Sequence, residues 1–137
     1  MALIEKIAPA LSYFIIDLTD KIEERLIQYD ITMRQYLILA DIYRKDGILM
    51  RELMKSKPYK AVFYRDLNYL HSKKMLTKRK GRKYKKNIYL HLTAYGESIV
   101  FDINEVVGKF ISKSQKDLRK VRCMINFLNE YSGSDAM

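Results

Sequence analysis

The sequence predicts a mainly α-helical protein that carries one small β-hairpin, an α+β arrangement. Apolar residues recur at three- and four-residue steps through most of the 137-residue chain, as in amphipathic helices. The period changes to two residues only near positions 76–92, which is typical of paired strands. With 48% hydrophobic residues, two prolines and five glycines, the chain is expected to form a real core from long regular elements. We expect one domain over residues 1–137.

The N-terminal segment, from about residue 3 to residue 28, is predicted to be a long amphipathic helix. Pro9 should kink this helix or mark its true start, because proline lacks a backbone donor. The apolar stripe is long for so short a protein, so it needs a further surface to cover it. Its members are Ile4, Ile7, Leu11, Phe14, Ile15, Leu18, Ile22 and Leu26.

Two shorter helices and a very short strand are predicted next. Thr32 and Gln35 have the spacing of a capping box that starts a helix, and the Asp-Gly pair at 46–47 ends it. Residues 48–49 are predicted to form a very short strand, and residues 50–55 a short helix. The side chains expected to face inward are Tyr36, Leu39, Ala40 and Tyr43 or their neighbours, then Leu53 and Met54.

A fourth helix is predicted from about residue 58 to residue 73. Pro58 signals its start, because proline is tolerated in a first helical turn. One face carries Phe63, Leu67 and Leu70 at spacings of four and three. The other face carries small, aromatic, amide and cationic groups, which suit phosphates and base edges better than plain solvent. These residues are Lys60, Ala61, Tyr64, Arg65, Asn68 and Ser72.

The hairpin contains most of the excess charge of the protein. Its strands are predicted at about 76–80 and 87–92, with the sequence GRKYKK between them. Residues 73–86 include nine of the 26 basic side chains and no acid, which leaves 17 basic against 16 acidic residues elsewhere. Nearly all of the formal charge of +10 therefore lies in one short stretch. Charge focused in this way creates a strong local potential and favours a polyanion as partner.

Two further helices are predicted after the hairpin. Thr93 can cap a helix from about residue 94 to residue 112, and a break at 112–114 separates it from a last helix over about 115–131. The apolar side chains of the first are Ile99, Ile103, Val106, Val107 and Phe110, and those of the second are Leu118, Val121, Ile125 and Leu128.

Several classes of protein are disfavoured by what the sequence contains. Cys123 is the single cysteine, so no internal disulfide can form, and its apolar helical context predicts a small core or interface residue. No apolar run reaches the roughly 18–20 residues that span a bilayer, and the expected location is cytoplasmic, associated with the nucleoid. His71 and His91 lie far apart without ligand-spaced partners, which predicts no metal site. No catalytic motif or cofactor loop is present, so we expect neither enzyme activity nor a cofactor.

The order of these elements is that of a winged helix-turn-helix, and the chain resembles the MarR (multiple antibiotic resistance regulator) family and related small archaeal winged-helix regulators. The resemblance covers residues 31 to about 100. Leu92-Thr93-Ala94-Tyr95-Gly96 is similar to the family's Leu-Thr-x-x-Gly start of a long C-terminal helix, after a basic hairpin at the expected distance. The other matching stretches are ITMRQYLILADI (31–42), MRELMKS (50–56), RDLNYL (65–70) and Met75-Leu76.

Two positions depart from the family pattern. The family usually has glycine at the exit of the recognition helix, where a positive φ is required, and this chain has Lys74. The turn there is expected to be strained or differently shaped. The family wing often carries an Asp that holds an Arg, whereas this chain has Tyr84, Lys85 and Lys86 and no acid. That substitution favours a flexible, multi-lysine wing with less base selectivity.

The resemblance implies a homodimer that binds double-stranded DNA through a winged-helix core at about 31–92. Residues 3–28 and 94–131 would supply the dimerisation helices, and the two recognition helices (58–73) would enter successive major grooves. A small-molecule effector is a feature of such regulators that no residue of this sequence supports. The residues predicted for the dimer interface are Ile7, Leu11, Phe14, Val107, Phe110, Val121, Ile125 and Leu128.

The predicted DNA contacts fall into a recognition-helix set and a wing set. Arg65 suits guanine and Asn68 suits adenine, while Arg82 and Lys83 near the wing tip would reach the minor groove or its flanking phosphates. The recognition-helix set is Tyr59, Lys60, Ala61, Tyr64, Arg65 and Asn68. The remaining wing residues, predicted to contact the phosphate backbone, are Lys78, Arg79, Lys80, Lys85 and Lys86.

Other functions are open at the level of sequence. A chromatin-like architectural protein that coats DNA with little sequence preference is favoured by the lysine-rich, acid-free wing. An RNA-binding winged helix would use the hairpin to grip a single strand or an A-form helix. A protein-protein module would use the long helices, leaving the basic patch incidental. The varied polar face of the fourth helix favours a sequence-specific transcriptional regulator over these three.

Overall fold

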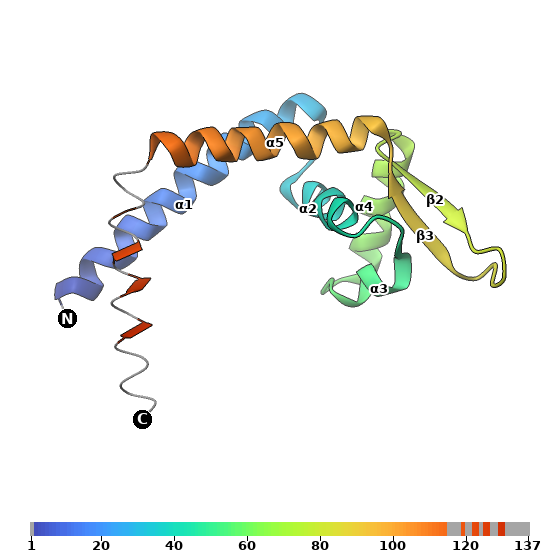
Figure 1. Cartoon of the computed structure of the whole chain (residues 1–137), viewed down its shortest axis with the longest axis horizontal. Helices are drawn as coiled ribbons and strands as arrows, with labels where there is room; N and C mark the ends of the chain where they lie inside the picture. Colours follow the sequence, from blue (N-terminus) through green and yellow to red (C-terminus); the bar gives the residue numbers. More distant parts are fainter. Residues whose placement is uncertain (1, 115–118, 120–121, 124, 127–128, 131–137) are drawn as a thin grey trace. The chain divides into compact units, whose positions relative to one another are not determined.

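The computed structural model describes residues 2–114, 119, 122–123, 125–126 and 129–130 (Figure 1). The chain divides into two compact units, one formed by Glu23–Asn104 and the other by Met1–Ile22 with Glu105–Met137. The elements are α1 (Ala2–Tyr29), α2 (Met33–Arg44), β1 (Ile48–Leu49), α3 (Met50–Lys55), α4 (Lys60–Ser72), β2 (Leu76–Lys80), β3 (Ile88–Leu92) and α5 (Ala94–Lys113).

The predicted mainly helical fold with a β-hairpin wing is confirmed, with two differences in helix boundaries. Pro9 lies inside α1 and does not start it, because the helix already begins at Ala2. Helix α4 begins at Lys60, two residues after the predicted start at Pro58. Tyr59 has an extended backbone (φ −127°, ψ 107°), so Pro58 and Tyr59 belong to the turn between α3 and α4.

None of the helices in the described ranges is long and apolar enough to cross a membrane.

The larger unit holds a small antiparallel sheet in the order β1-β3-β2. The hairpin strands pair in register from Leu76 opposite Leu92 to Lys80 opposite Ile88. β1 adds to the other edge of β3, with Ile48 opposite Leu90. Leu90, on the central strand β3, is fully buried. The hairpin of β2 and β3 extends past the helices as a wing (Figure 1).

Helix α2 supplies the centre of the core and starts with the predicted capping box. The Thr32 side chain accepts from Gln35 N, and Gln35 Oε1 accepts from Thr32 N at 3.0 Å. Tyr43 itself does not face inward, because it is 52% exposed. Its neighbour Ile42 is buried in its place, as the prediction allowed. The buried residues of α2 are Gln35, Ile38, Leu39 and Ile42, with Tyr36 and Ala40 half-buried.

Within the larger unit, α1 and α5 are joined by a hydrogen bond between Tyr29 and Asp102. The Tyr29 hydroxyl donates to Asp102 Oδ2 at 2.5 Å, and Arg25 approaches the same carboxylate at 3.6 Å. The hydrogen bond to Asp102 is the largest cause that raises the pKa of Tyr29 to about 12. Because the folded pKa exceeds that of an unfolded tyrosine, the stabilisation is fully present below about pH 10 and is lost as the pH rises from there through about 12.

The turn from α4 into the wing is held by α5. Lys74 has a φ of 60°, and its carbonyl accepts from Thr93 Oγ1 at 2.6 Å. Thr93 N donates to the Met75 carbonyl at 3.1 Å, and Thr93 Oγ1 also accepts from Gly96 N at 3.1 Å. A Cβ at Gly96 would lie 2.0 Å from the Met75 carbonyl oxygen. The Leu-Thr-x-x-Gly stretch therefore joins the exit of α4 to the start of α5.

Replacing Lys74 with glycine is expected to raise the free energy of unfolding by about 0.5–1 kcal/mol. A positive φ strains the backbone of an L-residue such as Lys74, and glycine adopts it without strain. The gain in folding free energy is reduced because an unfolded glycine has more conformational entropy to lose. Urea unfolding at fixed protomer concentration measures the change. Lys74→Ala removes the same long side chain but keeps the Cβ. If it stabilises the protein as much as glycine does, backbone strain is not the cause.

Candidate nucleic-acid interface

Helix α4 presents one exposed face of mixed chemistry and one buried face. The residues predicted for base contact, Lys60, Ala61, Tyr64, Arg65 and Asn68, are all exposed on it. Tyr59, just before the helix, is 71% exposed, against 39% for Tyr64 within it. The opposite face contains Phe63, Asp66, Leu67 and Leu70, each at most 2% exposed. The helix is therefore anchored on one side and free to contact a ligand on the other.

A buried carboxylate, Asp66, ties α4 to α2. Its Oδ1 accepts from Arg34 Nη2 at 3.1 Å and from Gln35 Nε2 at 3.2 Å, and its Oδ2 accepts from Arg34 Nε. Gln35 thus caps its own helix with its side-chain oxygen and holds Asp66 with its side-chain nitrogen. This network orients α4 against α2.

The sequence reasoning did not assign a role to Arg34 or Asp66, although a signal was present. Asp66 lies between Phe63 and Leu67 on the apolar face of the predicted helix. A carboxylate on a buried face must be paired, because burying an unpaired charge is costly. Its partner could not be found without the packing of α2 on α4, since 32 residues separate Arg34 from Asp66.

Replacing Asp66 with asparagine is expected to cost about 1–3 kcal/mol of stability at neutral pH. The hydrogen bond from Arg34 is the main cause that lowers the pKa of the Asp66 carboxyl. A lowered folded pKa stabilises the protein above the unfolded value of about 3.9, and this contribution disappears as the pH falls through the folded value. Urea unfolding of both proteins from pH 7 to about pH 2 tests this, and the two stabilities should converge in acid. A difference that stays constant with pH would contradict it.

The wing carries its cationic side chains in the open. Arg79, Lys80, Arg82, Lys83, Lys85 and Lys86 are exposed, and Lys78 is half-buried. These seven were the predicted wing contacts, and the strands and tip of one hairpin bring them together. No acidic residue occurs between positions 73 and 86, so nothing in this segment offsets their charge.

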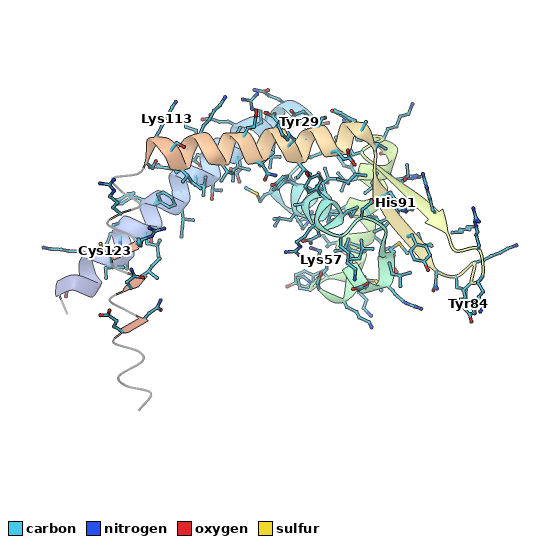
Figure 2. All side chains as sticks on the ribbon, viewed as in Figure 1. Tyr29, Lys57, Tyr84, His91, Lys113 and Cys123 are labelled. Carbon is cyan, nitrogen blue, oxygen red and sulfur yellow. The ribbon has the colours of Figure 1, made fainter. Side chains whose placement is uncertain are left out.

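The tip of the wing is a closed loop built around the carbonyl of Tyr84. Gly81 N donates to the Asn87 carbonyl at 2.8 Å, and Asn87 N donates to the Tyr84 carbonyl at 3.0 Å. A Cβ at Gly81 would lie 2.7 Å from the Tyr84 oxygen, so the loop requires a residue without a side chain there. The Tyr84 ring lies at the extremity of the hairpin and is 62% exposed (Figure 2). Tyr84 was not among the predicted DNA contacts, yet it lies among them.

The wing and α4 meet through a side-chain contact. Lys78 Nζ, on β2, donates to Asn68 Oδ1, on the exposed face of α4, at 2.7 Å. Through this bond, the predicted contacts of the helix and those of the strands are parts of one surface of the larger unit.

Farther along the sheet, His91 Nδ1 on β3 lies 3.1 Å from Asp46 Oδ1, in the turn before β1. His91 is labelled in Figure 2.

The described residues among those predicted for a dimer interface all lie in the smaller unit. The rings of Phe14 on α1 and Phe110 on α5 pack at a centroid distance of 5.5 Å, tilted by 55°, and both are half-buried, as are Leu11 and Val107. Ile7 is 6% exposed, Ile125 is 44% exposed, and Val121 and Leu128 lie outside the described residues. Apolar side chains that the prediction left out are also exposed here, namely Tyr13, Ile15, Ile16 and Ile111.

Cys123 and the histidines give no sign of a reactive or metal centre. The thiol is free and exposed, so the expectation of a core residue is wrong for this chain taken alone, while the interface expectation stays a prediction. In the described part of the chain, no three His, Cys, Asp or Glu side chains lie close enough together to hold a metal ion.

Solved structures with the same architecture match along nearly the whole chain. A transcriptional regulator from Thermotoga maritima matches at 22% identity with a TM-score of 0.68, over 95% of this chain and 94% of that one. The S. aureus MepR-DNA complex matches at 20% identity and 0.69, over 86% and 91%. A mutant MarR from E. coli complexed with operator DNA matches at 21% identity and 0.67, over 98% and 95%.

Comparison with models of protein families gives no match, and comparison with curated protein sequences gives none either. At identities of 20–22% the structural likeness establishes the fold. The chain has the winged helix-turn-helix fold of the MarR-type transcriptional regulators, with a three-stranded wing and long terminal helices. The resemblance inferred from the sequence is confirmed at the level of this fold.

Proposed function

We propose that the protein is a non-enzymatic transcriptional regulator that binds double-stranded DNA as a homodimer. The observation that carries the proposal is the joined surface of α4 and the wing, where an exposed polar helix face meets a strand of an acid-free, cationic hairpin at the Asn68–Lys78 contact. Two of the structures with this fold were solved with DNA, the MepR and MarR complexes. A polyanion with a groove wide enough for a helix fits such a surface.

In this proposal α4 enters the major groove and the wing follows the phosphates. Arg65 and Asn68 face base edges, and Tyr59, Lys60, Ala61 and Tyr64 line the same side of the helix. Arg82 and Lys83 reach the minor groove or its flanking phosphates, because they lie at the wing tip. Such phosphate contacts fix position, and the base contacts give sequence preference.

The dimer of this proposal uses the long helices outside the winged core. Support comes from the apolar side chains that one chain leaves exposed on α1 and α5, among them Ile15, Ile16 and Phe101. A two-fold axis would place two α4 helices in successive major grooves about one helical turn apart. Sedimentation equilibrium tests this part, with a mass twice 16.3 kDa expected.

The architectural function remains a second candidate because of one observation. The wing has no acid to hold a single arginine in place, so its cations can contact phosphates in any sequence.

The regulator and the architectural protein both predict that the affinity for DNA depends strongly on salt. If six to ten phosphates are neutralised per dimer, affinity for duplex DNA should fall by roughly 10³–10⁵ between 50 and 200 mM salt.

Fluorescence anisotropy with a labelled duplex over a salt series tests nucleic-acid binding. The regulator and the architectural protein both require a steep loss of affinity with salt. Competition by unlabelled single-stranded and duplex RNA separates these from an RNA-binding function, which predicts that RNA displaces the duplex. Binding that is weak at low salt and insensitive to salt would reject all three and leave a protein-protein module.

A further inference from the structure

The contact between Lys78 and Asn68 determines which chemical groups the recognition helix offers. Asn68 is exposed and lies three residues after Arg65, so the two share one face of α4. Lys78 is half-buried on β2 and pairs with Leu90 of β3, which is fully buried. This pairing holds in place the strand from which the Lys78 side chain reaches α4. Its Nζ lies 2.7 Å from Asn68 Oδ1 and donates to it.

This hydrogen bond changes what an asparagine can recognise. A free asparagine reads adenine with both ends of its amide, accepting from N6 and donating to N7. In this protein the accepting end already faces an ammonium group. The amide oxygen keeps a second lone pair, but a base amino group bonded there would bring its positive hydrogens beside the Lys78 charge.

The pair therefore presents mainly hydrogen-bond donors. Asn68 Nδ2 keeps its two N–H groups, and the Lys78 ammonium keeps those not directed at Asn68. The major-groove edge of guanine has two acceptors, O6 and N7, and no donor, whereas thymine has one acceptor, O4, beside its methyl group, and adenine and cytosine each present an amino group. A pair rich in donors therefore matches guanine best and opposes the amino groups of adenine and cytosine.

We propose that Lys78 is a specificity-determining residue that acts through Asn68, converting it from an adenine reader into a guanine reader. The inference rests on the proposed function, because it requires α4 to lie in the major groove. It replaces the simpler pairing of Asn68 with adenine, and it gives Lys78 a positioning role distinct from that of the phosphate-contacting cations of the wing.

The test compares base preference in the full-length protein and in Lys78→Met. The base pair that Asn68 reads is first located as the position of a bound duplex where Asn68→Ala loses discrimination. Duplexes with each of the four base pairs at that position are then titrated at fixed salt. The wild type should favour guanine, and Lys78→Met should shift the adenine-to-guanine affinity ratio toward adenine by roughly tenfold.

Lys80→Met is the matched control. Lys80 lies two residues farther along β2 and carries the same charge. Loss of a phosphate contact lowers affinity for all sequences alike and reduces the salt dependence. We therefore expect Lys80→Met to weaken binding without changing the four-way preference. The same uniform loss for Lys78→Met would overturn the inference and leave Lys78 as a phosphate contact.

A measurement on the free protein separates this inference from the proposed function. In protein labelled with ¹⁵N at asparagine, Lys78→Met should shift the side-chain amide signals of Asn68, and Lys80→Met should leave them in place. Unshifted Asn68 signals would overturn the inference even if duplex binding is strong. Shifted signals without any duplex binding would overturn the proposed function and, with it, the role of the contact in base reading.

Discussion

Replacing Gly96 with alanine is expected to lower the free energy of unfolding by about 3 kcal/mol or more. The added Cβ would lie 2.0 Å from the Met75 carbonyl oxygen and 3.1 Å from its carbonyl carbon. Both atoms belong to backbone, which cannot rotate away as a flexible side chain can. The same carbonyl accepts from Thr93 N, so relief of the clash breaks the link between α4 and α5.

Gly108→Ala is the matched control, because Gly108 lies in the same helix with open space around its Cβ position. Alanine in a helix interior is favoured over glycine by about 1 kcal/mol, so this variant should be slightly more stable than the wild type. Urea unfolding of the three proteins at one protomer concentration measures both changes. Equal stability of the two variants would show that α5 does not approach Met75 as described.

Reversing the charge of Arg82 and Lys83 to glutamate should lower the affinity for duplex DNA by roughly a hundredfold or more at physiological salt. Both side chains are exposed at the wing tip, and no acid in the segment compensates for them. In a dimer four phosphate contacts would be lost, so the slope of log affinity against log salt should become less steep by about four. Anisotropy titrations over a salt series measure both quantities.

The control for net charge is the same reversal at Lys109 and Lys113, two exposed lysines of α5 outside the wing. The effect of this reversal should be small, because neither lysine belongs to the surface of α4 and the wing that contacts DNA in the proposal. If the two double variants weaken binding equally, the net charge and not the wing drives association. Unchanged binding by the wing variant would favour the protein-protein module.

The fold followed from the sequence wherever a local rule decided it. The capping box at Thr32 and Gln35, the two-residue period of β3 and the Leu-Thr-x-x-Gly stretch each fixed a boundary or a junction. Lys74 takes the positive φ that its place at the helix exit requires, although it is not glycine. The start of α4 was missed by two residues, because proline suits both a first helical turn and the preceding turn.

The candidate site was predictable in its residue types and not in its contacts. Exposure of the α4 face and of the wing follows from helical and strand periods, so most predicted contacts are exposed. The Arg34–Asp66 bond and the Lys78–Asn68 bond connect separate elements and depend on packing that no local pattern encodes. Tyr84 was left out of the predicted DNA contacts. An aromatic residue in a basic run does not by itself predict such a contact, and the place of Tyr84 at the tip follows only from the loop around Gly81.

Selection of bound duplexes from a random DNA pool at physiological salt tests the central claim most directly. A dimeric regulator with α4 in the major groove predicts a palindromic consensus whose half-sites lie about one helical turn apart. Guanine should be enriched at the base position that Asn68 contacts, if Lys78 holds the Asn68 amide as proposed. A pool that stays unenriched while binding remains strong and steeply salt-dependent would contradict sequence-specific regulation and establish the architectural function instead.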